Sequence, residues 1–122
     1  MEAGAPGEDV ADFLAALRVR NVEVATAGTV SQPFFEPTGW RILADGRSLQ
    51  VYQYPATGNA REAASTISPD GNTIGETTVD WIGPPHWYQH GRLLVLYVGS
   101  DPNLRQVLED VLGHQVAGAL PH

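Results

Sequence analysis

Two histidines, His86 and His90, stand four residues apart in the stretch PPHWYQHGR at 84–92. On a helix this interval places both imidazoles on one face, where they could hold a metal ion. A helix is not expected here, because two prolines precede the pair and Gly91 follows it. A zinc site also needs three or four ligands. We therefore interpret the stretch as a hairpin connection with partly buried histidines bonded to backbone. A two-imidazole metal site is the alternative, and no metal or other cofactor is predicted.

The same stretch combines aromatic side chains with an arginine, the residue types that dominate binding energy at protein contacts. The two prolines stiffen its entry, so Trp87 and Tyr88 could be held partly exposed at little entropic cost. The alternative is that both rings turn inward and close one end of the core. The residues predicted to contact a ligand or partner are His86, Trp87, Tyr88, His90, Arg92, Tyr52 and Tyr54.

No catalytic motif is recognisable in the chain. It lacks Gly-x-Ser-x-Gly, His-Glu-x-x-His and a glycine-rich phosphate loop, and DGNTIGE has too few acids for an EF-hand loop. Acids on loops and strand ends are usually solvated, but a carboxylate pair remains an alternative. Its candidates are Glu36, Asp45, Glu76 and Asp80. No catalytic residue is predicted, and an enzyme is the less favoured interpretation.

The charge of the chain limits its partners. Fourteen acidic residues face seven arginines with no lysine, which gives a formal net charge of −7. Such a surface repels phosphate backbones and anionic lipid heads, so neither nucleic acid nor a membrane surface is an expected partner. The absence of cysteine excludes disulfides and thiolate chemistry. No apolar run approaches the ~20 residues that cross a bilayer, so no transmembrane segment is predicted.

Apolar residues recur at helical spacing in three segments. The first predicted helix covers residues 8–20. The second is expected to begin after Asn59, a residue type that caps helices well. The third begins at Asp101 and Pro102, because proline suits the first helical turn, and Gly113 ends it.

Period-two patterns and apolar runs predict strands in the rest of the chain. In the segment 40–55, Asp45-Gly46 supplies the two positive-φ positions of a type I′ turn, which sets Ile42 opposite Leu49 in a hairpin. The polar or aromatic face of that hairpin would carry Tyr52 and Tyr54. Further strands are expected at 21–27, 77–82 and 92–99.

The order α-β-β-β-α-β-β-α predicts a single α+β domain, a mainly antiparallel sheet with its helices on one face. We expect a flexible N-terminal segment at 1–7, the domain at 8–118 and a C-terminal tail at 119–122. Residues 93–98 are apolar on both faces of their strand, so the face away from the helices needs a cover. Either a loop at 30–35 or a second copy of the chain could cover this face. We expect a homodimer that forms through it.

Four segments carry a resemblance to a known group: VSQPFF, VYQYP, ISPDGNTIGETTVDWIGPPHWYQHGRLLVLYVGSD and LEDVLGHQVAG. In this order they resemble a group of small, uncharacterised bacterial exported proteins described as lipoproteins. The resemblance implies an extracytoplasmic protein whose precursor has a signal peptide. A lipid anchor on that precursor is left open, because this chain has no cysteine to carry it. The first seven residues lack the apolar core of a signal peptide, so a mature domain is expected. The resemblance implies no catalytic residue.

Together these features predict an extracytoplasmic binding or interaction module without catalytic activity, whose partner is an unidentified protein or small molecule. The alternative is a small enzyme or small-ligand carrier with a pocket near the 84–92 connection. A pocket with convergent polar groups would favour the alternative, whereas a filled core with a flat aromatic face would favour the first interpretation.

Overall fold

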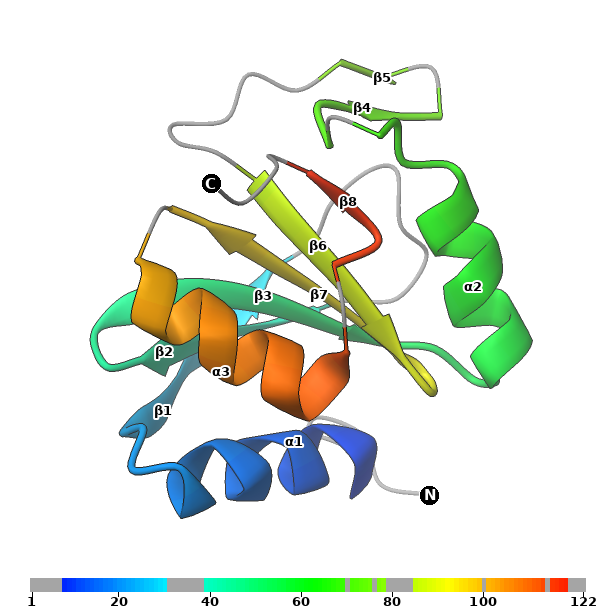
Figure 1. Cartoon of the computed structure of the whole chain (residues 1–122). Coiled ribbons are helices and arrows are strands. Elements are labelled where there is room, and N and C mark those ends of the chain that lie inside the picture. The colour runs from blue at the N-terminus through cyan, green and yellow to red at the C-terminus, as the bar shows by residue number, and fades with distance from the viewer. Residues whose placement is uncertain are drawn as a thin grey trace.

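The computed structural model describes residues 8–30, 39–69, 71–75, 77–78, 85–99, 101–113 and 115–118. Three helices and eight strands lie in these ranges (Figure 1). The helices are α1 (Glu8–Val19), α2 (Thr57–Ser65) and α3 (Pro102–Leu112). The strands are β1 (Val24–Val30), β2 (Gly39–Ala44), β3 (Arg47–Gln53), β4 (Thr73–Ile74), β5 (Thr77–Thr78), β6 (Pro85–His90), β7 (Leu93–Val98) and β8 (Ala117–Gly118).

Six strands form one sheet in the order β1-β2-β3-β7-β6-β8, and each neighbouring pair is antiparallel. The predicted α+β fold with a mainly antiparallel sheet is confirmed. Strand β7 lies between β3 and β6, and its residues 93–97 are buried. This is the position expected for an apolar run covered on both faces. Strands β4 and β5 form a separate two-stranded sheet.

The hairpin of β2 and β3 has the predicted register. Asp45 and Gly46 adopt φ values of 51° and 81°, as a type I′ turn requires. Ile42 is opposite Leu49, and Trp40 is opposite Val51. The type I′ turn therefore accounts for the register of this hairpin.

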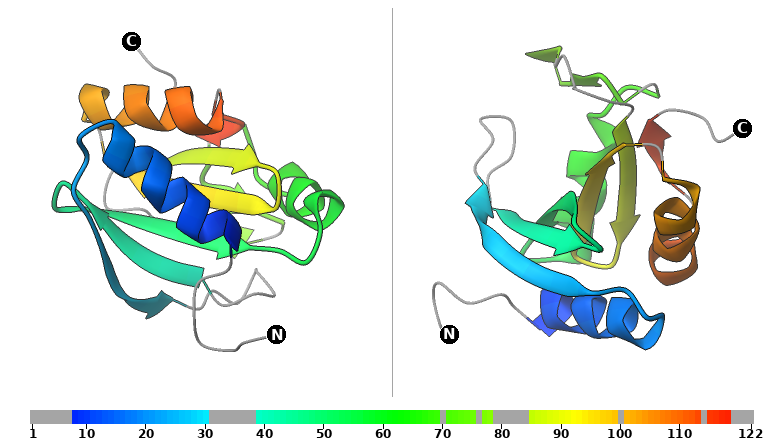
Figure 2. Two further views of the ribbon diagram at one scale, coloured as in Figure 1. Left: turned by 90° about the horizontal axis from the view of Figure 1, so that it is seen from below. Right: turned by 90° about the vertical axis from the view of Figure 1, so that its left-hand side faces the viewer.

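The helices cover both faces of the sheet, so the expectation that all lie on one face is wrong for α2. Helices α1 and α3 pack with Val51 and Val95, whereas α2 packs with Tyr52 and Leu94. Figure 2 shows α1 and α3 beside each other and α2 apart from them. Successive residues of a strand face opposite sides, and β3 and β7 are apolar on both sides, so each side requires its own cover.

Helix α2 provides that second cover with small residues. Ala60 is buried, and Ala63 and Ala64 pack against the same cluster. The uncovered sheet face on which we based the expected homodimer is therefore covered from within the chain. Of the loop at 30–35, all but Val30 lies outside the described residues, as do the segments at 1–7 and 119–122.

Two helix starts differ in how well they were predicted. Helix α3 begins as expected, because the Asp101 carboxylate accepts a hydrogen bond from the Asn103 N–H at 3.0 Å. Helix α2 begins earlier than expected: its N-cap is Ala56, which offers no side-chain acceptor, and Asn59 lies inside the helix. Side-chain capping stabilises a helix end but is not required for one.

The stretch predicted to be a connection is mostly strand β6. Residues 85–90 pair with β7 along their whole length, and only Gly91 and Arg92 turn the chain. Proline is tolerated as the first residue of a strand, and aromatic residues favour strands, so Pro85, Trp87 and Tyr88 suit this state. Of the strand expected at 77–82, β5 covers Thr77–Thr78, and the rest lies outside the described residues.

Glycine is required where β8 joins β6. Gly118 has φ of +120°, and a Cβ atom there would lie 2.9 Å from the Cα of His86 and closer still to the carbonyl oxygen of Pro85. No other residue type avoids both problems. In the described part of the chain, no helix is long and apolar enough to cross a membrane.

Candidate functional site

Strand alternation divides the chemistry-bearing residues of β6 between the two faces of the sheet. Tyr88 belongs to the cluster beneath α1 and α3, and Trp87 belongs to the cluster beneath α2. His90, two positions from Tyr88, lines a pocket on the α1 and α3 side. His86 stacks on Tyr97, another member of the α1 and α3 cluster.

Five of the seven predicted contact residues are buried. Tyr52 and Trp87 have no exposed surface, and His86, Tyr88 and Tyr54 are 1%, 1% and 6% exposed. They cannot form an accessible aromatic face in this structure, because β3 and β6 are internal strands with both faces covered. His90 is exposed and Arg92 is half-buried.

Trp87 is fixed by contacts that cross from the sheet to the turn before β4. Its indole N–H donates to the carbonyl oxygen of Gly71 at 3.1 Å. Its backbone carbonyl accepts from the N–H of Val116 at 2.7 Å. The ring packs in the cluster with Ala60 and Leu96. These contacts place Trp87 in the inward orientation that the sequence left as the alternative.

His86 is held by two polar contacts inside the fold. Its Nε2 lies 2.9 Å from the carbonyl oxygen of Gly99, and its Nδ1 lies 2.9 Å from Oε1 of Gln115. The ring stacks on Tyr97 with 5.9 Å between centroids. Both nitrogens are therefore occupied, which matches the expected backbone-bonded histidine at this position.

The two histidines cannot share one metal ion. Four residues along a strand span about 13 Å, in contrast to the close spacing on a helix that would bring the rings together. His86 is buried with both nitrogens engaged, whereas His90 is exposed at the far end of β6. Among the residues that the structure describes, no group of three or more histidines and acids could hold a metal.

Tyr88 is unsuited to act as a base or nucleophile. Burial raises the pKa of its phenol to about 12; the Arg105 charge opposes that rise, while Glu109 and Tyr97 add to it. The phenol is therefore protonated at neutral pH. Of the four acids considered for a carboxylate pair, Asp45 lies in the β2–β3 turn and accepts from the N–H of Glu23 at 2.9 Å. The other three lie outside the described residues.

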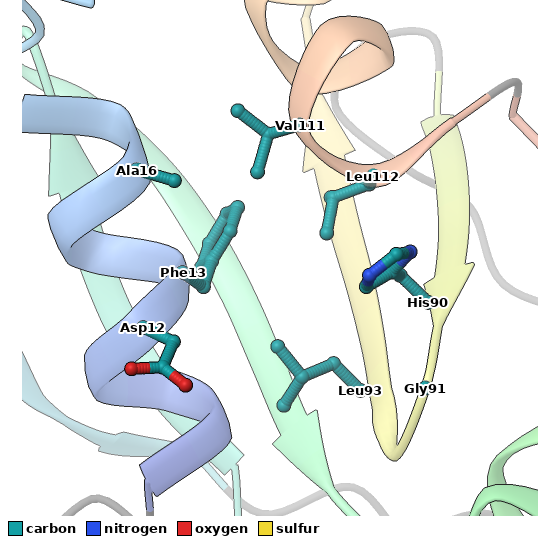
Figure 3. A pocket seen from close by; sticks show the side chains of 8 residues that line it. All are labelled: Asp12, Phe13, Ala16, His90, Gly91, Leu93, Val111 and Leu112. Atoms are coloured by element: carbon teal, nitrogen blue, oxygen red, sulfur yellow. The ribbon is translucent and has the colours of Figure 1, made fainter. Parts of the chain in front are cut away.

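A cavity of about 310 Å³ lies between α1, the end of α3 and the turn from β6 to β7 (Figure 3). We call it the α1–α3 pocket. Helix α1 contributes three residues on one of its faces, and α3 contributes its last two residues. The end of β6, the β6–β7 turn and the start of β7 contribute the rest. The lining residues are Asp12, Phe13, Ala16, His90, Gly91, Leu93, Val111 and Leu112.

The pocket has an apolar floor and a polar mouth. Phe13, Leu93 and Leu112 are buried, whereas Asp12 and His90 are exposed. In Figure 3 the carboxylate of Asp12 and the ring of His90 approach the cavity from different elements. Neither side chain has a hydrogen-bond or ion-pair partner among the described residues. A small apolar group could fill the floor while a polar group bonds at the mouth.

Sequence reasoning located one part of this pocket. His90 was a predicted contact residue, and the pocket adjoins the predicted segment. Asp12, Phe13 and Val111 were missed, because Phe13 and Val111 follow the helical periodicity of ordinary core residues. No signal in the chain marks the gap that their helices leave.

The comparisons with known proteins add no transferable residue. No family model, no curated protein and no solved structure matches this chain. A function is therefore inferred from the pocket and the residues around it.

Proposed function

We propose that this chain is an extracytoplasmic binding module without catalytic activity, and that it binds a small ligand in the α1–α3 pocket. The observation that carries the proposal is the pocket itself, a cavity of about 310 Å³ with an apolar floor and with Asp12 and His90 at its mouth. Its size lies at the lower end of the roughly 300–1,000 Å³ typical of small-molecule sites.

The pocket is a better candidate than an aromatic docking face. Residues that dominate protein contacts must be accessible before they bind. Trp87 and Tyr52 are fully buried within the fold, so the surface first expected to recognise a partner is absent from the described residues. His90 is the member of the predicted stretch that borders a cavity.

Binding is favoured over catalysis by the chemistry of the lining. Among the described residues, the pocket has no hydroxyl, thiol or amine side chain that could attack a substrate. The Tyr88 phenol has a raised pKa and belongs to the buried cluster, not to the pocket wall. Asp12 and His90 suit recognition of a polar group, which needs no activated nucleophile.

The extracytoplasmic location is supported by the resemblance to exported bacterial proteins. It is tested by adding protease to intact cells that express the native gene. We expect the domain to be digested either in intact cells or after permeabilisation of the outer membrane, in both cases without lysis of the cytoplasmic membrane. Protection in both intact cells and outer-membrane-permeabilised cells would contradict the location and would leave the pocket proposal standing.

The pocket proposal is tested by a fragment screen with amide NMR shifts as the readout. We expect fragment-induced shifts to centre on α1, the end of α3 and residues 90–93. Ala16→Phe should abolish them, because the new ring fills the cavity from its α1 wall. Ala15→Phe is the matched control, since Ala15 is exposed on the same helix and does not line the pocket. Binding that survives Ala16→Phe in a folded protein would overturn the proposal.

A further inference from the structure

We infer that the ligand of the α1–α3 pocket is a small organic cation, with a compact apolar body and an ammonium group. This inference rests on the proposed function and adds the chemical class of the ligand. The apolar body follows from the floor, where Phe13, Leu93 and Leu112 are buried. A cavity of about 310 Å³ suits a single ring or a short branched chain more than a large molecule.

The sign of the ligand's charge follows from Asp12. Among the described lining residues, Asp12 is the one acid, and the lining contains no lysine or arginine. Its carboxylate has no partner among the described residues, so no arginine neutralises it there. An ammonium group at the mouth gains Coulomb attraction, whereas a carboxylate ligand would meet repulsion.

The end of α3 adds to the same field. Val111 and Leu112 are its last two residues, so the negative end of the helix dipole lies at the pocket. The last turn of α3 has no basic residue that would oppose this field. The positive end of the α1 dipole acts most strongly on the first turn of that helix. Asp12 lies beyond this turn, so the α1 dipole does not cancel the effect of α3.

Hydrogen bonding is consistent with an ammonium group. Such a group has three donors and no acceptor. The Asp12 carboxylate accepts, a neutral His90 imidazole has one accepting nitrogen, and the terminal carbonyls of a helix lack partners within it. Arg92, the nearby cation of the turn, has an interaction within the chain and does not line the pocket.

The test compares three ligands of nearly one shape: benzylamine, benzyl alcohol and benzoate. They are titrated by NMR at neutral pH and low ionic strength. We expect benzylamine to bind most tightly and benzoate most weakly. Asp12→Asn should weaken benzylamine about fivefold, as loss of an exposed ion pair does, and leave benzyl alcohol unchanged.

Asp110→Asn is the matched control. It removes the same charge from an exposed position next to Val111, but Asp110 does not line the pocket. It should change benzylamine binding much less than Asp12→Asn does. An equal effect of the two substitutions would attribute the preference to net charge and overturn a role for the pocket carboxylate.

The outcomes separate this inference from the proposed function. If the fragment screen finds pocket ligands but benzylamine binds no better than benzyl alcohol, the cation inference is wrong and the pocket proposal stands. If benzoate binds most tightly, the inference is also wrong. If no fragment shifts the pocket resonances, the proposed function itself fails.

Discussion

The two sides of the sheet differ in the size of the residues that their helices contribute. On the α2 side, the helix presents alanines and the sheet supplies large rings, among them Tyr52 and Trp87. On the α1 and α3 side, the helices themselves supply bulky residues such as Phe13, Leu17 and Leu108. The cavity at His90 lies on this second side, where two helices and a hairpin turn meet.

The difference teaches that a stretch singled out in the sequence need not form one surface in space. Trp87 and Tyr88 are neighbours in the chain, yet they belong to separate clusters on opposite faces. Only at His90, where β6 ends, does the stretch reach a cavity. The pocket therefore lies at the end of the strand, while the middle of the strand belongs to the core.

The largest effect is expected from Trp87→Ala on the α2 side. The substitution removes a fully buried ring and the bond to Gly71, so we expect the free energy of unfolding to fall by about 3–5 kcal/mol. Urea denaturation measures the loss. Trp87→Phe retains an aromatic ring and separates the packing contribution from the N–H bond.

Val19→Ala is the control for this prediction. Val19 is 79% exposed, and its truncation should change the free energy of unfolding by less than about 0.5 kcal/mol. A cost below about 1 kcal/mol for Trp87→Ala would mean that the α2 side does not depend on its central ring. Our description of that side as filled by the sheet would then be wrong.

The α1 and α3 side should respond to alkaline pH through Tyr88. Burial raises the pKa of this phenol from 10.0 to about 12 in the folded protein. The folded state therefore holds its proton where the unfolded state loses it. The stabilising contribution is complete below pH 10 and is lost as pH rises to about 12, up to about 3 kcal/mol.

Tyr88→Phe isolates this contribution from the other titrating groups. Urea denaturation of both proteins across the range from pH 9 to 12 gives the difference. We expect the wild-type protein to lose stability more steeply than the variant. Parallel losses would show that the phenol ionises alike in the folded and unfolded states.

Local features of this fold could be predicted from sequence because a few residues determine them. Asp45-Gly46 sets the β2–β3 register through its positive φ values, and Asp101 marks the start of α3 with its carboxylate. The face covered by α2 could not be predicted, because β7 is apolar on both sides and favours neither. Strand β6 was mistaken for a connection, since the pair Pro84-Pro85 at its start and Gly91 after it are residue types that mark turns and loops in most sequences.

The pocket was the least predictable feature. Phe13 and Leu112 follow ordinary helical periodicity and belong to the same cluster as the other core residues on this side. Whether a gap remains between two helices depends on their distance and angle, which packing along the whole interface determines. Only the position of His90, at the end of the stretch first singled out, connects the predicted site with the observed one.

The smallest effect concerns the ends of the helices that cover the two sides. Asp101 caps α3 and also pairs with Arg47 at 2.9 Å, whereas Ala56 provides no side-chain cap for α2. We expect Asp101→Ala to lower the free energy of unfolding by about 1 kcal/mol, and Ala56→Ser to raise it by a similar amount or less. Ala56 is exposed and has the extended φ and ψ of an N-cap, so serine fits without strain.

Asp101→Ser distinguishes the cap from the ion pair. Serine retains a capping oxygen but cannot pair with Arg47, whose side chain is 48% exposed. An exposed pair contributes little, so Asp101→Ser should recover most of the stability that Asp101→Ala loses, and Arg47→Ala should cost less than Asp101→Ala. Thermal unfolding of Asp101→Ala, Asp101→Ser, Arg47→Ala and Ala56→Ser measures these differences in stability. If Asp101→Ser is as unstable as Asp101→Ala, the link to Arg47 stabilises the start of α3 more than its cap does, and α3 depends on the β2–β3 turn for its position.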